Sequence, residues 1–360
     1  MPVHLVGDAS SHEFMVRARG NPNGGIHDSA PAINIGLINN MPDGALKATE
    51  RQFLSLLDSV AEGVIVRISL YALPEVPRSA SAKEHIKRFY SGIEQLWDGR
   101  LDGLIVTGTE PRAQSLRDEP YWNSVAKVID WAGQNTHSTV WSCLAAHAAV
   151  LHCDGIGRRR LPEKRFGVFD GGRASEHPLT TGLSAPLRTP HSRWNDIAES
   201  ELADCGYDIL TRSRDGGVDS FARTRKSLFV FFQGHPEYEA NTLLLEYRRD
   251  IARYLKGERD TYPAMPEGYF DAQTADLFAG LRDRLLTNRC PEMLADFPAG
   301  PAVERISHTW RSASAQIYGN WLAYVRARNR RSAQGRSRRK YVQRERDPGV
   351  RLPMSRAELG

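Results

Sequence analysis

Short apolar runs alternate with amphipathic segments over the first two thirds of the chain. The apolar runs are rich in β-branched residues and predict strands buried on both faces. They lie at 33–39, 64–71, 101–108, 139–141 and 226–238. Apolar residues recur at helical spacing in the segments between these runs, which predicts helices. These segments lie at 41–60, 85–97, 120–135, 144–151 and 239–255.

This order of elements predicts an α/β protein. Strands that alternate with helices build a parallel sheet that helices cover on both faces. The expected fold class is therefore α/β, with a doubly wound, mainly parallel sheet flanked by helices. Ligands of such sheets bind at the carboxyl ends of the strands, so candidate residues are expected there.

Both ends of the chain depart from this pattern. Residues 1–30 are rich in Gly, Asn, Ser and Pro, which predicts a flexible N-terminal arm. From residue 326 to residue 360 apolar residues are few and positive charge is dense, which predicts a disordered tail with a helical start. Residues 31–325 remain as one folded domain.

The net charge of +5 comes from this tail rather than from the folded domain. Ten of the 21 residues from Arg326 to Arg346 are Arg or Lys, and without them 38 basic residues face 43 acidic ones. A basic tail binds polyanions by releasing their counterions, without sequence specificity. Polyanion binding is therefore a hypothesis for the tail alone, and a solvated appendage is the alternative.

The composition is typical of a globular protein from a reducing compartment. No apolar run approaches the ~20 residues of a membrane span, and the first residues lack the basic and apolar regions of a secretory signal. The four cysteines are far apart and form no CxxC pair, which argues against a zinc knuckle or a disulfide framework. We therefore expect a cytoplasmic protein without a membrane partner.

Cys143 stands where the apolar run 139–141 meets a helical segment. A sharp strand-to-helix turn would lift its side chain out of the sheet, and the helix N-terminus would favour a thiolate. The backbone N–H of Leu144 would then point at a developing oxyanion. This is the geometry of a nucleophile elbow. The alternative is a buried core cysteine, which is the usual state of free cysteines.

A base for this nucleophile follows another predicted strand. The sequence GHPEY places His235 and Glu237 two residues apart at the end of the apolar run 226–238. A thiol nucleophile needs a base, and a carboxylate fixes the tautomer of that base. The three residues predict a Cys–His–Glu triad, against the alternative of simple turn residues. His147 shares a helix face with Cys143, but no third ligand is near, so no metal site is expected.

Six segments in a fixed order resemble the homoserine O-succinyltransferase family, an offshoot of the class I glutamine amidotransferase fold. They are DGLIVTG, STVWSCLAAHAA, APLRTPHSRW, GHPEY, LEYRRD and SHTWRSASAQIYGNWLAYV. The resemblance spans residues 33–326. It implies a class I glutamine amidotransferase-like fold for residues 31–325, which would form an acyltransferase domain.

The resemblance implies a ping-pong acyl transfer that serves the synthesis of methionine. Cys143 would attack the thioester of an acyl-coenzyme A and hold the acyl group. His235, oriented by Glu237, would then deprotonate the side-chain hydroxyl of L-homoserine. Succinyl-CoA or acetyl-CoA is implied as the co-substrate, with succinyl-CoA favoured. The resemblance implies no permanently bound cofactor. It also implies that the protein forms a homodimer.

The resemblance also implies roles for residues outside the triad. Lys164 and Ser192 match positions that contact the substrate, and Arg249 matches the arginine that holds the substrate carboxylate. Arg112 stands at the position that selects the acyl group, where the family has a small residue for succinyl and an acidic one for acetyl. Its guanidinium would clamp the succinyl carboxylate or point to solvent. Lys47 would supply positive charge near the oxyanion site.

Three alternatives remain open from the sequence. The acceptor would be a close hydroxy amino acid such as serine, or Cys143 would retain the ancestral hydrolysis of glutamine. The third alternative is a protein without catalytic activity that binds nucleic acid on a former enzyme scaffold, and the basic tail is its only support.

Overall fold

The computed structural model describes residues 3–6, 32–214 and 217–345, with side chains described as far as Arg331. Ten strands within these residues form one sheet in the order β1-β3-β2-β4-β5-β10-β9-β8-β6-β7. Six of them are parallel to one another and the remaining four are antiparallel. The parallel strands are β1 (Val3–Leu5), β3 (Ile65–Tyr71), β2 (Ala32–Ile38), β4 (Gly103–Thr107), β5 (Ser138–Ser142) and β10 (Leu228–Phe232).

The parallel strands end together, which places their carboxyl ends at one edge of the sheet. Ser142, the last residue of β5, pairs with Thr107 of β4 on one side and with Phe232 of β10 on the other. The residues that follow these three strand ends therefore lie close together. Cys143 and the segment that holds His235 are among them.

The antiparallel part of the sheet was not predicted from the sequence. It comprises β9 (Val218–Thr224), β8 (Asp208–Ser213), β6 (Arg159–Arg173) and β7 (Leu187–Asp196). Charged residues are frequent in β6 and β7, so these strands lack the apolar runs that mark the parallel ones. The prediction of a doubly wound α/β fold is confirmed for the parallel half, and this extension is added to it.

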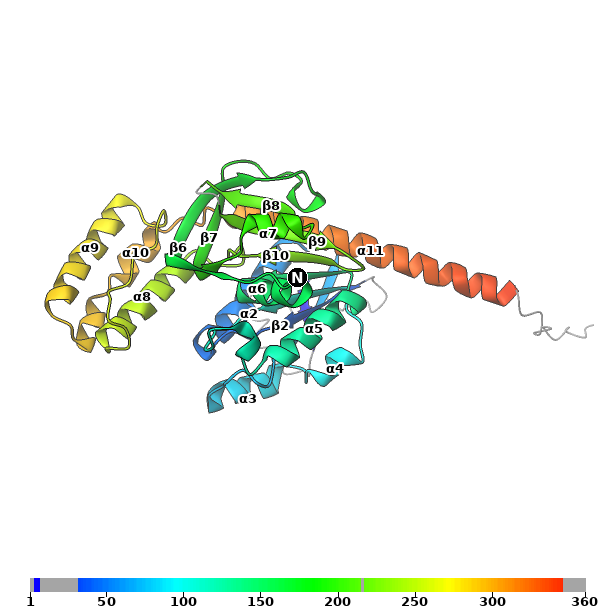
Figure 1. Cartoon of the computed structure of the whole chain (residues 1–360), viewed down its shortest axis with the longest axis horizontal. Coiled ribbons are helices and arrows are strands. Elements are labelled where there is room, and N and C mark those ends of the chain that lie inside the picture. Colours follow the sequence, from blue (N-terminus) through cyan, green and yellow to red (C-terminus); the bar gives the residue numbers. More distant parts are fainter. Residues whose placement is uncertain (1–2, 7–31, 215–216, 346–360) are drawn as a thin grey trace, which may run out of the picture.

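Helices cover both faces of the sheet (Figure 1). One face packs against α4 (Glu94–Trp97), α5 (Trp122–Asn135), α6 (Leu144–Asp154) and α7 (Glu199–Asp204). The other face packs against α2 (Asp43–Val60) and the first turns of α11 (Arg311–Glu345). Val140 and Trp141 of β5 belong to the two opposite cores, as expected for a strand that is buried on both faces.

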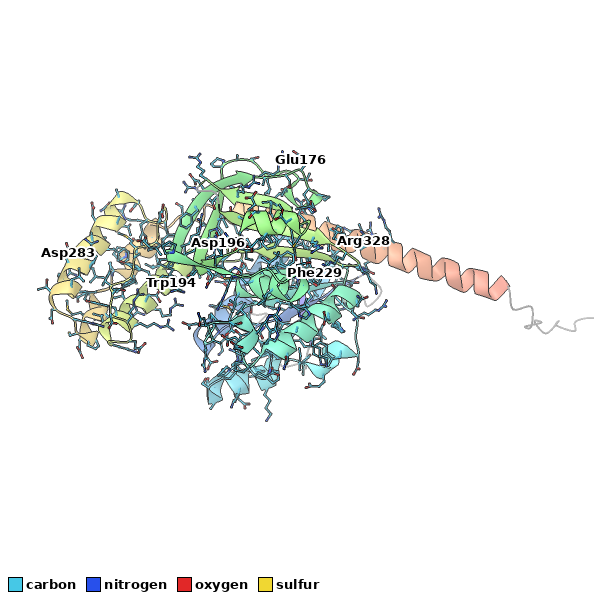
Figure 2. The ribbon with its side chains drawn as sticks, viewed as in Figure 1. Glu176, Trp194, Asp196, Phe229, Asp283 and Arg328 are labelled. Carbon is cyan, nitrogen blue, oxygen red and sulfur yellow. The ribbon has the colours of Figure 1, made fainter. Side chains whose placement is uncertain are left out.

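A third core joins β6 to a helical lobe. The lobe comprises α8 (Thr242–Leu255), α9 (Ala272–Thr287) and α10 (Ala299–Arg305), and it packs around Tyr247 and Phe278. In Figure 1 these helices lie together at one end of the molecule, and the far end of α11 projects at the other. In Figure 2, Asp283 marks the helical lobe, and Arg328 marks the part of α11 from which its far end projects.

Two predicted elements have different bounds in the structure. The helix expected over 85–97 is divided into α3 (Ala80–Phe89) and α4, because Ser91 donates its N–H to Leu70 and leaves the helical path. The strand expected over 226–238 ends at Phe232. The following residues to Tyr238 form the turn that holds the candidate histidine.

Short helical segments connect some of these elements. They are η2 (Leu116–Asp118), η3 (Pro178–Thr180) and η4 (Pro291–Asp296).

At the two ends of the chain the structure describes more regular structure than the sequence predicts. Residues 3–5 of the expected arm form β1, which pairs in parallel with β3. The tail has the helical start that the sequence predicts, and this helix, α11, continues as far as Glu345. Residues 7–31 and 346–360 lie outside the described part. Among the described helices, none combines the length and the apolar character needed to cross a membrane.

Candidate active site

Cys143 lies in a sharp turn between β5 and α6. Its backbone has φ 52° and ψ −112°, and among the described residues no other non-glycine residue has a positive φ. Its N–H donates to the carbonyl of Phe232 at 2.7 Å, which ties the turn to the end of β10. A strained backbone held by its surroundings is typical of a functional site. The half-buried Cys143 side chain therefore leaves the sheet in the geometry expected of a nucleophile elbow.

Gly108 makes room for this turn. A Cβ at Gly108 would lie 2.4 Å from the Cβ of Leu144 and 3.0 Å from its backbone nitrogen. The chain after β4 therefore passes directly against the first residue of α6. Only glycine permits this approach without displacing the Leu144 N–H, which is the candidate oxyanion donor.

We expect the substitution Gly108→Ala to lower turnover by about 10²-fold, because shifting the elbow by about 1 Å misaligns the reacting atoms. Steady-state kinetics would measure the loss, and Gly157→Ala is the matched control since a Cβ there meets no atom within 4 Å. Equal activity of the two variants would contradict this role of Gly108.

His235 and Glu237 form a buried pair beyond β10. The Nδ1 of His235 lies 2.8 Å from Oε1 of Glu237, and the Ser142 hydroxyl donates to the same carboxylate oxygen at 3.3 Å. The His235 backbone N–H donates to Pro190 at 2.8 Å, which fixes the turn against β7. Because Nδ1 faces Glu237, the Nε2 atom is left to face Cys143.

The pKa of His235 depends on its burial and on its two neighbours, Cys143 and Glu237. Burial lowers the pKa of the imidazole, but the charges of Cys143 and Glu237, and their hydrogen bonds to the ring, raise it well above its usual value. The protonated form of His235 is therefore favoured by both of its neighbours, Cys143 and Glu237. The structure thus brings together the three residues that the sequence nominates as a triad.

The three predicted substrate-binding residues come from β6, β7 and α8 and meet at two carboxylates of α8. Ser192 donates to Oε2 of Glu246 at 2.5 Å. Lys164 lies 3.0 Å from Asp250 and 3.9 Å from Glu246. Arg249 lies 2.9 Å from Asp250 and 3.7 Å from Glu246. The cluster holds two cations and two anions and is therefore neutral overall.

Charge pairing sets the protonation of this cluster. Burial raises the pKa of the Asp250 carboxyl, but Lys164 and Arg249 lower it below its usual value. Asp250 is thus a carboxylate at neutral pH. The side chain of Arg249 is 47% exposed, so its guanidinium is accessible to a bound molecule.

The sequence analysis did not identify Glu246, Asp250 or Tyr238 as site residues. The hydroxyl of Tyr238 donates to Oε1 of Glu246 at 2.6 Å, and its ring stacks on His235. The only signal in the sequence is spacing, because residues 246, 249 and 250 share one face of a helix. That signal gains meaning only once β6 and β7 are known to lie against α8.

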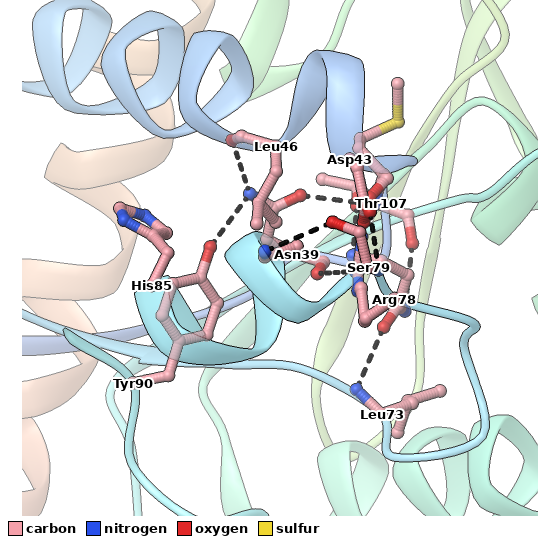
Figure 3. A network of polar contacts seen from close by, with 12 residues as sticks. Asn39, Asp43, Leu46, Leu73, Arg78, Ser79, His85, Tyr90 and Thr107 are labelled. Atoms are coloured by element: carbon pink, nitrogen blue, oxygen red, sulfur yellow. Dashed lines mark hydrogen bonds and ion pairs between the residues drawn. The ribbon is translucent and has the colours of Figure 1, made fainter. Parts of the chain in front are cut away.

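Lys47 lies on α2, one residue after Leu46. The loop that precedes this helix holds a dense polar network (Figure 3). Arg78 donates to the carbonyls of Met41 and Asn39, and Asn39 donates to the carbonyl of Leu46 at 3.0 Å. The network fixes the loop between β2 and α2, but the Lys47 side chain is exposed. Its role at the oxyanion site stays a prediction.

The buried carboxylate of Glu119 supports the main chain at Arg112. Its Oε1 accepts from the N–H groups of Arg112 at 2.6 Å and Ala113 at 2.7 Å. Arg158 donates to the next carbonyl, that of Gln114, at 3.1 Å. The main chain at position 112 is therefore fixed, whereas the Arg112 side chain is exposed.

A small pocket lies between this loop and the elbow. Gly108, Tyr121 and Leu144 line it. Over the described residues, no group of three or more His, Cys, Asp or Glu side chains is placed to hold a metal ion.

The model of one protein family, described as homoserine O-succinyltransferase, matches residues 19–331. The chain belongs to the homoserine O-succinyltransferase family. A homoserine O-succinyltransferase of Rhodopseudomonas palustris is 48% identical over 294 residues, which cover 82% of this chain and 88% of that protein. One of Bradyrhizobium japonicum is 48% identical over 294 residues, covering 81% of this chain and 90% of that protein.

Among solved structures, a glutamine amidotransferase from Methylobacillus flagellatus matches 82% of this chain and 96% of that chain, with 15% identity and a TM-score of 0.48. The homoserine O-succinyltransferase family match spans all of the site residues described above. It ends within α11, so the last 29 residues of the chain lie outside it.

Proposed function

We propose that the chain is an acyl-CoA-dependent homoserine O-acyltransferase that uses succinyl-CoA and forms a Cys143 thioester. The observation that supports this most is the coupling of the Cys143 elbow to the His235–Glu237 pair. Family membership adds the class of reaction, and the neutral ion cluster on α8 adds a binding site for an amino acid.

In the first half-reaction the Cys143 thiolate attacks the thioester carbonyl of the acyl donor. The resulting oxyanion would accept a hydrogen bond from the N–H of Leu144. This N–H lies at the start of α6, where amide groups lack helical partners. Collapse of the intermediate breaks the bond to the coenzyme sulfur, and the His235 imidazolium gives that sulfur its proton. The acyl group remains on Cys143 and the free coenzyme thiol leaves.

Acylation changes the base that performs the second half-reaction. The charge of Cys143 raises the pKa of His235, and that charge disappears once the sulfur is esterified. Burial, which lowers the pKa of His235, then acts against Glu237 alone. The imidazole is therefore more readily neutral in the acyl-enzyme, where it must accept the proton of the homoserine hydroxyl.

The cluster on α8 suits a zwitterion. The guanidinium of Arg249 would bind the amino-acid carboxylate through two parallel hydrogen bonds, and the carboxylate of Glu246 would bind the ammonium group. The substrate then exchanges each existing ion pair for an equivalent one. This exchange keeps every charge paired, which a half-buried site requires.

We expect Arg249→Lys to raise the KM for homoserine by about 10- to 100-fold, since a lysine keeps the charge but loses the planar fork. Initial rates at varied homoserine and saturating acyl donor would measure it. Arg248→Lys is the matched control on the neighbouring position. The proposal for Arg249 fails if both variants have the same KM.

Intact-mass spectrometry tests the function as a whole. After mixing with succinyl-CoA or acetyl-CoA, the mass added to the protein identifies the acyl group, and later addition of homoserine or serine identifies the acceptor that removes it. We expect a succinyl adduct that homoserine removes. Glutamine hydrolysis without release of coenzyme A would overturn the proposal. An acetyl adduct would instead identify acetyl-CoA as the donor, and removal of the adduct by serine alone would identify serine as the acceptor.

We propose that Arg112 contributes to the preference for succinyl-CoA as the acyl donor. The main chain at Arg112 is fixed by Glu119, and the exposed guanidinium is free to reach a succinyl carboxylate. Methionine synthesis, cytoplasmic location, a homodimer and polyanion binding by the tail stay predictions from the sequence.

A further inference from the structure

Tyr238 lies between the candidate base and the candidate amino-acid site. Its ring is stacked on the imidazole of His235, with centroids 4.2 Å apart and planes at 15°. Its hydroxyl donates to Oε1 of Glu246 at 2.6 Å. The side chain is almost fully buried. One side chain therefore contacts both the group that would move the proton and the carboxylate that would hold the ammonium.

The main chain of Tyr238 is fixed on both sides. Its N–H donates to the carbonyl of His235 at 3.1 Å, within the same turn. Its own carbonyl accepts the indole N–H of Trp310 at 2.8 Å, at the base of the helical lobe. Trp310 is also buried, so the packing of the lobe fixes the position of Tyr238.

The carboxylate of Glu246 is oriented by two hydroxyls. Tyr238 donates to Oε1 from the turn beyond β10, and Ser192 donates to Oε2 from β7. Burial and the neighbouring charge of Glu246 both raise the pKa of Tyr238 well above its usual value. The phenol thus stays protonated at neutral pH and acts as a donor to Glu246.

We propose that Tyr238 is a positioning residue for the acceptor half-reaction, holding Glu246 at a fixed span from His235. The inference rests on the proposed function. An amino acid bound by its ammonium at Glu246 then presents its hydroxyl to the imidazole only if its side chain has the right length. Homoserine has one methylene more than serine, so the fixed span would also favour homoserine over serine as the acceptor.

Tyr238→Phe separates this role from general stability. It keeps the ring on His235 and removes only the hydrogen bond to Glu246, so we expect acylation of Cys143 by succinyl-CoA to stay within about 2-fold. Transfer to homoserine should fall about 10- to 100-fold in kcat/KM, the usual effect of losing a hydrogen bond to a charged group. The ratio of kcat/KM for homoserine to kcat/KM for serine should fall.

Two further variants complete the experiment. Tyr238→Leu also removes the stacked ring, and we expect it to slow both half-reactions. Tyr262→Phe removes another buried tyrosine hydroxyl of the helical lobe and should change neither. Stopped-flow release of coenzyme A measures acylation, and decay of the adduct mass with homoserine measures transfer.

The outcomes separate this inference from the proposed function. A wild-type protein that no acyl-CoA acylates would overturn the proposed function. If the wild type is acylated and Tyr238→Phe transfers its acyl group to homoserine at the normal rate, the role of Tyr238 is wrong. It is also wrong if this variant slows acylation and transfer by the same factor, because a purely structural effect would do so.

Discussion

Cys143→Ala should abolish acyl transfer, with a fall in turnover of about 10⁶-fold, because no other group at the elbow can carry the acyl chain. The protein adduct that forms with succinyl-CoA should disappear in the same variant. The physical reason is the strained turn at Cys143, which places this thiol beside His235 and the Leu144 N–H. Intact mass and coenzyme A release measure the two effects.

Cys153→Ala is the matched control, because Cys153 lies on α6, the helix that follows Cys143, and is also half-buried. Burial raises the pKa of the Cys153 thiol to about 11, so it stays protonated at neutral pH and is a poor nucleophile. This variant should retain both the adduct and the turnover. An adduct that persists in Cys143→Ala and is lost in Cys153→Ala would reverse the assignment.

Glu237→Gln should lower turnover by about 10³- to 10⁴-fold, the range seen when the carboxylate of a catalytic triad is neutralised. The amide cannot hold His235 in the same tautomer and no longer stabilises the imidazolium. Because the charge of Glu237 raises the pKa of His235, its removal lowers that pKa. The imidazolium needed for acylation is then lost at lower pH.

A pH profile tests this sign directly. The alkaline limb of kcat/KM for the acyl donor should move to lower pH in Glu237→Gln than in the wild type. Glu239→Gln, two residues further along the chain, is the control and should keep both the rate and the profile. An unchanged alkaline limb in Glu237→Gln would show that Glu237 does not act through His235.

In the proposed mechanism the two half-reactions would use different parts of the same site. Acylation would depend on the elbow and on the imidazolium that Glu237 stabilises. Transfer would depend in addition on the cluster of Lys164, Arg249 and Glu246, where we propose that the amino acid binds. Tyr238 contacts both parts, so its variants distinguish them.

The elbow and the pair beyond β10 could be predicted because their signals are local. A cysteine at a strand-to-helix junction, and a histidine two residues before a glutamate at a strand end, are visible in short windows of sequence. Hydrophobic periodicity then places both strands in one parallel sheet, whose carboxyl ends meet at one edge. The predicted helix on 41–60 is confirmed for the same reason, since Phe53 and Leu57 face the core.

The break between α3 and α4 shows where local signals fail. The pattern over 85–97 fits one amphipathic helix, but Tyr90 turns its hydroxyl to Glu50 on α2, and Ser91 bonds to β3. The preference of these residues for a helix is outweighed by contacts with residues 20 to 40 positions earlier. In α11 long-range packing and local preference agree, since Tyr318 and Trp321 of its first turns pack on the sheet.

By itself the sequence determined the fold class and predicted the candidate nucleophile and the candidate base, because each of these depends on residues close together in the chain. Only the tertiary structure decided which side chains Lys164, Ser192 and Arg249 contact. They belong to β6, β7 and α8, and they meet at Glu246 and Asp250 because an antiparallel extension with few apolar signals folds back onto the helical lobe. Long-range packing, rather than any local pattern, sets that contact.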